Sequence, residues 1–124
     1  MEFFALARRR SHEQELRDKL TVASLPNWCG LIDAAWNARQ DSGTVYCLWG
    51  EFHVRREPVR GGVRFTLPDC PNAVAWTVTA GLPPTPDMVV IHCTINRPEH
   101  APEFVESLQD FVSAWKEGLE ARFR

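Results

Sequence analysis

The chain has 124 residues, which is enough for one domain and too few for two. Hydrophobic residues make up 44% and charged residues 24%, proportions of an ordinary globular protein that exclude wholesale disorder. The formal net charge of −2 argues against a protein whose whole surface binds nucleic acid.

The sequence carries no signal for export or membrane insertion. Residues 1–7 are too few for a signal peptide, and no apolar stretch approaches the ~18 residues of a membrane span. The four cysteines include no C-x-x-C pair, so the commonest zinc and redox motifs are absent. We therefore expect a cytoplasmic protein without a membrane anchor, a metal or a cofactor.

The first forty residues favour two helices. Residues 3–7 are an apolar patch that fits either a short strand or a helical turn. Ser11 followed by Gln14 has the pattern of a capping box and predicts a helix that ends before Pro26. Apolar residues then recur at three-and-four spacing, which predicts a second helix over residues 27–39.

From Thr44 onward the apolar residues alternate, as they do in strands. Gly50 marks a bulge or a bend within the first strand, and Gly61-Gly62 is typical of a hairpin turn. A proline-rich segment at 82–87 predicts a stiff loop before the last strand. Short connections predict a four-strand antiparallel meander. Its strands are expected over 44–55, 63–67, 74–79 and 88–95.

The C-terminal segment has the clearest pattern. Pro102 suits the first turn of a helix, and a broad apolar stripe runs from Phe104 to Leu119. That stripe must bury against one face of the sheet. The expected fold is a single α+β domain over residues 1–124, with two N-terminal helices, four strands and one long helix. A strand at 3–7 would add a fifth strand and give a helix-grip outline, a shape that often holds a ligand.

The alternation assigns a polar and aromatic mixture to the other face of the sheet. Its candidate binding residues are Trp49, Glu51, His53, Thr77 and His92. Such a mixture is typical of a ligand or partner surface, with the indole as its apolar anchor. It also fits a plain solvated face whose threonines reflect strand propensity. A one-residue slip near Gly50 would move the first and third of these residues into the core.

Four arginines concentrate around the predicted hairpin. They are Arg55, Arg56, Arg60 and Arg64. Arginine binds phosphate in a bidentate manner, so this basic patch could contact a nucleic acid. A charged hairpin also resists edge-to-edge aggregation, and the acidic overall balance favours that interpretation.

A catalytic or zinc cluster of Cys47, His53 and His92 is a further alternative, because a Cys–His pair can generate a thiolate nucleophile. Their separation in the sequence does not bring them together. No nucleotide-binding, metalloprotease or serine-hydrolase motif occurs either. We therefore assign no catalytic residue and no metal ligand.

These observations favour a non-enzymatic binding or protein-interaction module, acting through the open sheet face or a strand edge. Unpaired edges and aromatic faces favour self-association, so we expect a homodimer. The alternative is a helix-grip domain, ligand-binding or enzymatic, whose cavity is lined by Phe65, Trp76, Phe111 and Trp115. Weak nucleic-acid contact through the arginines is a third hypothesis, which the net charge disfavours.

Overall fold

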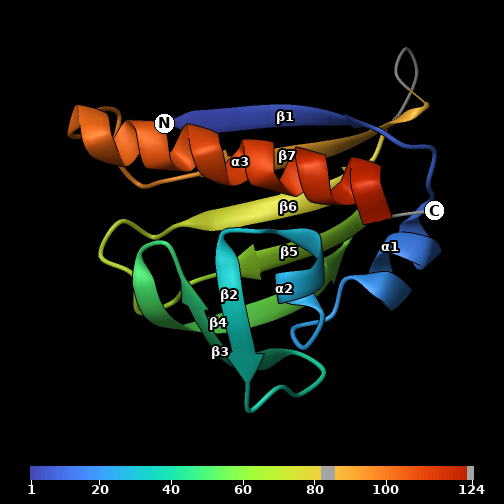
Figure 1. Ribbon diagram of the computed structural model, residues 1–124, viewed down its shortest axis with the longest axis horizontal. Helices are drawn as coiled ribbons and strands as arrows, with labels where there is room; N and C mark the ends of the chain where they lie inside the picture. The colour runs from blue at the N-terminus through green and yellow to red at the C-terminus, as the bar shows by residue number, and fades with distance from the viewer. Residues whose placement is uncertain (82–85, 123–124) are drawn as a thin grey trace.

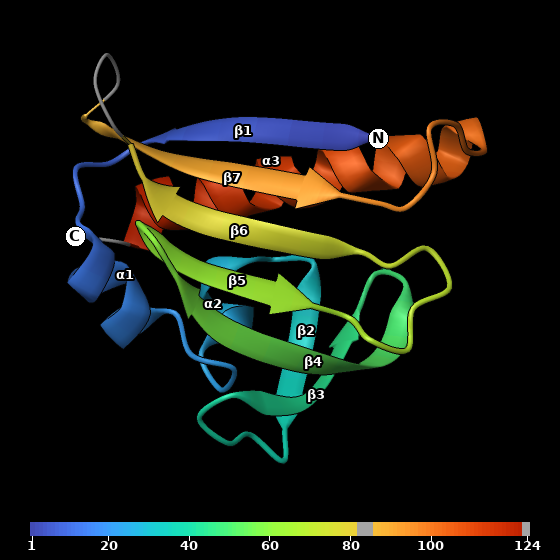
Figure 2. The same ribbon diagram turned by 180° about the vertical axis from the view of Figure 1, so that it is seen from behind.

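The computed structural model describes residues 1–81 and 86–122. Seven strands form one antiparallel sheet in the order β1-β7-β6-β5-β4-β3-β2. Figure 1 shows α2 and α3 on one side of this sheet, and Figure 2 shows strands β5, β6 and β7 uncovered on the other side. The elements are β1 (Glu2–Arg8), α1 (Glu13–Lys19), α2 (Leu25–Trp28), β2 (Ile32–Trp36), β3 (Ser42–Cys47), β4 (Gly50–Val59), β5 (Gly62–Thr66), β6 (Ala75–Ala80), β7 (Met88–Thr94) and α3 (Pro102–Arg122).

The expected class is confirmed: a mixed α+β fold in which a long C-terminal helix packs on one face of an antiparallel sheet. The expected strand number is wrong, since the sheet has seven strands rather than four or five. The apolar N-terminal patch is a strand. It pairs with β7 in antiparallel register, from Glu2 opposite Thr94 to Arg8 opposite Met88. The predicted loop at 82–87 lies outside the described residues except for its last two positions.

The helix expected over 27–39 is wrong. Helix α2 ends at Trp28, and the chain then forms β2, which pairs with β3 from Ile32 to Trp36. A bulge between Ile32 and Ala34 shifts the register. The bulge interrupts the period-two alternation of the strand, so the apolar spacing resembles that of a helix. Pairing with β3 therefore makes residues 32–36 a strand, although their local pattern favours a helix.

The strand expected over 44–55 is two strands joined by a tight turn at residues 48–49. Gly50 has a φ of 113°, a conformation that favours glycine over residues with a Cβ. One continuous strand would put Tyr46 on the same face as Val54, but the chain reverses here and the alternation before the turn is the opposite. Val45 and Cys47 are buried, whereas the Tyr46 side chain faces solvent. After the turn the alternation is as expected, with Val54 buried.

Helix α1 begins one residue later than the sequence suggests. His12, rather than Ser11, is the N-cap, and its Nδ1 accepts a hydrogen bond from the Glu15 amide at 3.3 Å. The helix is fixed to the β4–β5 hairpin by two side chains. Glu13 accepts a hydrogen bond from the Gly61 amide at 2.8 Å, and Arg17 donates one to the Val59 carbonyl at 2.8 Å.

The hydrophobic core lies between the sheet and α3. Helix α2 closes one end of it through a backbone contact with α3. A Cβ at Gly118 would lie 1.8 Å from the carbonyl oxygen of Trp28, so only glycine allows this approach. Within the described residues, no helix combines the length and the apolar character that a membrane span requires.

Candidate functional site

The sheet has two faces with different chemistry. We call the face that packs against α3 the inner face and the opposite one the outer face. Four large aromatic side chains, each at most 2% exposed, meet between the inner face and α3: Phe65 and Trp76 from the sheet, and Phe111 and Trp115 from the helix. Ring centroids are 5.4 Å apart for Phe65 and Trp76, 4.9 Å for Trp76 and Phe111, and 6.4 Å for Trp76 and Trp115. The side chains expected to line a cavity therefore meet one another, and we call them the aromatic cluster.

Two indole groups of the aromatic cluster are buried without a hydrogen-bond partner. They are the Nε1 atoms of Trp76, on β6, and Trp115, on α3. A nearby indole behaves differently, since Trp49 donates to the Ser107 hydroxyl at 2.9 Å. Leaving a buried donor unpaired costs about 1–3 kcal/mol. Because indole only donates, only an acceptor atom could pair with either of these groups.

Buried donors without a partner also occur just after β1. Nε and Nη2 of Arg9 are buried and also lack an acceptor. Every buried, unpartnered side-chain polar atom in the described part of the chain is thus a nitrogen donor.

A hollow of about 250 Å³ lies at the seam between α2 and α3, beside the Gly118 contact. It adjoins both helices that cover the inner face. Its lining residues are Pro26, Asn27, Trp28, Gly30, Ala114, Glu117 and Gly118.

The buried cysteines do not have the character of nucleophiles. Burial raises the pKa of Cys29 and Cys93 to about 12, and burial also raises the pKa of Cys47. A nucleophilic cysteine needs the opposite shift, because the thiolate is the reactive form. Cys47 faces the inner side of the sheet, whereas His53 and His92 lie on the outer face. In residues 1–81 and 86–122, no group of three or more His, Cys, Asp or Glu side chains is placed to hold a metal ion.

The candidate binding residues do not form one cluster. Trp49 lies on the inner side, where its ring is 4.9 Å from that of Phe111. The reversal of the chain at the β3–β4 turn explains this placement. Thr77 and His92 do lie side by side on the outer face, as cross-strand neighbours on β6 and β7.

The outer-face histidines have separate surroundings. His92 stacks on Phe4 with ring centroids 4.3 Å apart, and its Nε2 lies 3.0 Å from a carboxylate oxygen of Glu2. His53, on β4, lies 3.3 Å from Asp69. Glu51 is exposed two residues before it. The two histidines are therefore independent polar groups rather than parts of one site.

The basic patch is dispersed as well. Arg56 is 9% exposed and donates to the Leu20 carbonyl at 2.6 Å, so it caps the end of α1 beneath the sheet. Burial lowers its pKa. Arg64 faces outward, 3.9 Å from Glu57. Arg60 is exposed at the hairpin turn.

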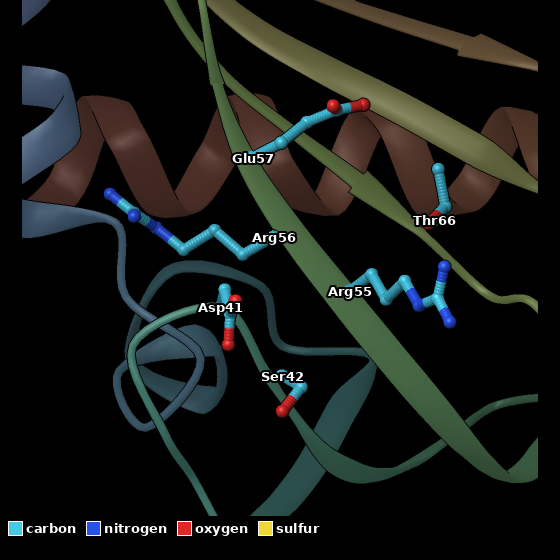
Figure 3. Close-up of a pocket in the computed structure, with 6 residues that line it drawn as sticks. All are labelled: Asp41, Ser42, Arg55, Arg56, Glu57 and Thr66. Atoms are coloured by element: carbon cyan, nitrogen blue, oxygen red, sulfur yellow. The ribbon is translucent and has the colours of Figure 1, made fainter.

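Arg55 lies in a hollow on the outer face. This hollow has a volume of about 540 Å³, and Figure 3 shows its walls formed by β3, β4 and β5. A second hollow of about 460 Å³ shares Ser42 and Arg55 with it. Sequence reasoning missed both, because Ser42 reads as a turn residue and only its pairing with Arg55 reveals the site.

Comparison with known proteins supports the fold and nothing finer. No family model matches the sequence, and no curated protein matches it. The protein XoxI from Bacillus cereus has a similar structure, with a TM-score of 0.69 and 12% identity over 98% of this chain and 94% of that one. A START superfamily protein from Mycobacterium smegmatis gives a TM-score of 0.61 and 12% identity, over 98% and 94% of the two chains. An uncharacterised protein from Bacillus thuringiensis also gives 0.61 and 12%, over 94% and 97%. The chain thus has a START-like fold.

Proposed function

We propose that the protein binds a small, largely apolar molecule between the inner face of the sheet and α3. The observation that carries this proposal is the pair of buried, unpartnered indole N–H groups of Trp76 and Trp115. The START-like arrangement of sheet and long helix supports it by analogy, because ligand pockets often form where two packed elements of a fold meet.

The lining chemistry defines the ligand class. Aromatic and aliphatic walls select apolar surface, and the two indoles select a molecule with at least one hydrogen-bond acceptor. The aromatic cluster fills the space between the sheet and α3, so binding requires these rings to move apart. The seam at Gly118 is the contact between covering elements that such a movement would loosen.

A matched pair of probes tests this proposal. Acetophenone and ethylbenzene have similar shapes, and only acetophenone has a carbonyl acceptor. We expect acetophenone to bind at least ten-fold more tightly in NMR titrations, since a site built to donate a hydrogen bond discriminates against an analogue that lacks the acceptor. Replacing Trp76 or Trp115 with Phe removes one donor and should reduce that preference.

Trp49→Phe is the control, because it removes an indole N–H that already has a partner. It should leave the preference for acetophenone unchanged. Equal affinity for both probes would contradict the proposed role of the indoles. Absence of saturable binding by either probe, together with no small molecule retained in native mass spectra of the purified protein, would overturn the proposed function.

The second candidate is a protein-interaction surface on the outer face, with self-association as a homodimer. The observation that favours it is the exposure of Phe4 (60%) and Leu6 (43%) on β1, which is an edge strand of the sheet. Exposed apolar side chains beside an unpaired edge favour association with a second strand. Thr77 and His92 would lie inside the contact, because His92 stacks on Phe4.

Sedimentation velocity over a range of concentrations tests this candidate. We expect a dimer that Phe4→Glu converts to a monomer. Trp36→Glu is the matched control, since Trp36 is also exposed but lies on β2, at the opposite edge of the sheet. A wild-type protein that remains monomeric at every concentration would exclude the homodimer.

A further inference from the structure

Two arginine side chains beside Ser42 have no partner of their own. Neither Arg39 nor Arg55 makes a side-chain hydrogen bond or ion pair with any residue in 1–81 or 86–122, although other arginines in this part of the chain do. Both line the hollow of about 460 Å³ on the outer face. We call this hollow, together with the adjoining one of about 540 Å³, the Ser42 groove.

The backbone holds the two arginines on either side of one serine. The Arg39 amide donates to the Ser42 carbonyl at 2.8 Å across the β2–β3 turn, and Ser42 is the register partner of Arg55 on β4. Thr44 and His53 form the next pair on the same face of these two strands and also line the groove. Two guanidinium groups, the hydroxyl groups of Ser42 and Thr44 and the imidazole of His53 therefore line one concave surface.

Among the described residues, no carboxylate pairs with either of the two arginines. Asp41 and Glu57 line only the larger hollow, and Glu57 already pairs with Arg64. Asp69 lies against His53. Arg39 and Arg55 thus carry unpaired positive charge, while the larger hollow offers carboxylate acceptors.

We propose that the Ser42 groove binds a small oxyanion, a phosphate- or carboxylate-bearing molecule whose charged group lies between Arg39 and Arg55. Guanidinium groups pair with the planar or tetrahedral oxygens of such anions through two hydrogen bonds at a time. The Ser42 and Thr44 hydroxyls supply further donors. The carboxylates of Asp41 and Glu57 accept hydrogen bonds from hydroxyl or amine groups elsewhere on the same molecule.

This site is separate from the proposed inner-face ligand site, because it lies on the opposite side of the sheet. Either proposal can fail without the other. Their probes also differ, since those for the inner face are uncharged.

NMR titration of the ¹⁵N-labelled protein with pyrophosphate, and separately with citrate, tests the proposal. We expect saturable shifts confined to the amides of residues 39–44 and 53–55 and to the side-chain Nε–H groups of Arg39 and Arg55. Stronger binding of pyrophosphate would identify a phosphate ligand, and stronger binding of citrate a carboxylate ligand. Arg39→Gln and Arg55→Gln should each weaken binding by about ten-fold or more, since a charge-assisted hydrogen bond is lost.

Arg60→Gln is the matched control. It removes the same charge from an exposed arginine at the β4–β5 turn, outside the groove, and should change the affinity less than two-fold. Equal weakening by Arg60→Gln and Arg55→Gln would show non-specific attraction and overturn the proposal. Shifts scattered over the surface, or no saturation with either anion at low ionic strength, would overturn it as well.

Discussion

The inner and outer faces of this sheet differ although the same strands form both. On β6, Trp76 is 2% exposed within the aromatic cluster, while the next residue, Thr77, is a partly exposed neighbour of His92. The packing of the inner face depends on the volumes and shapes of its buried side chains. On the outer face, the register of the strands decides which polar side chains become neighbours. We therefore expect that substitutions on the inner face change stability and that substitutions on the outer face change surface chemistry, nearly independently of each other.

The largest expected difference between the faces is in stability. Trp115→Ala removes a fully buried ring from the aromatic cluster and should lower the free energy of unfolding by about 3–5 kcal/mol. Thr77→Ala, on the outer face, should change it by no more than about 0.5 kcal/mol. Urea unfolding followed by circular dichroism measures both. Similar losses for the two variants would contradict the assignment of the core to the inner face alone.

The next largest loss of stability is expected at the contact between α2 and α3. Gly118→Ala places a Cβ 1.8 Å from a backbone oxygen, so one helix must move. We expect a loss of about 2–3 kcal/mol despite the better helix propensity of alanine. Gly30→Ala is the control, because a Cβ there meets no atom within 4 Å. A Gly118→Ala protein as stable as wild type in thermal unfolding would mean that the helices are not in close contact.

Arg55 and Arg56 are consecutive on β4 but lie on opposite faces of the sheet, so substitutions there compare the two faces directly. Arg56→Met keeps an apolar side chain beneath the sheet but removes the donors for the carbonyl groups at the end of α1. The free energy of unfolding should fall by about 2 kcal/mol. Arg55→Met, on the outer face, should leave it within about 0.5 kcal/mol of wild type. If the two variants unfold at the same urea concentration, Arg56 does not have the structural role that its contacts indicate.

The smallest expected effect concerns the thiols. Cys29, Cys47 and Cys93 are buried and their pKa values are raised, so the reactive thiolate is scarce at each. Cys70 is partly exposed. A disulfide reagent at pH 8 should therefore modify Cys70 first in the native protein, with the other three reacting only on unfolding. Mass spectrometry of the labelled peptides identifies the site, and rapid native labelling of Cys93 would contradict its burial.

The features that could be read from the sequence are those set by local chemistry. The apolar stripe of α3 and the Gly61-Gly62 hairpin are in the expected places. Strand β2 was missed because its bulge disturbs the alternation, and the placement of Trp49 was missed because Gly50 ends a turn rather than forming a bulge. These errors come from non-local pairing, which one sequence does not display.

The candidate sites were harder to predict than the fold. Thr77 and His92 were correctly placed on a common face because period-two alternation determines facing. Arg56 was assigned to a surface patch because nothing local indicates that it caps α1. The Ser42 groove needs the register of β3 with β4, and the unpartnered indoles need the packing of α3 on β6. Neither arrangement is visible in the spacing of residues.

The five tryptophans allow the most direct test of the proposed inner-face site. In a ¹H–¹⁵N spectrum each indole Nε1–H gives its own signal. On saturation with acetophenone, we expect the Trp76 and Trp115 signals to move downfield as their N–H groups gain an acceptor, while the signals of Trp49 and of exposed Trp36 stay in place. Saturable binding that leaves the Trp76 and Trp115 signals unchanged would contradict the account.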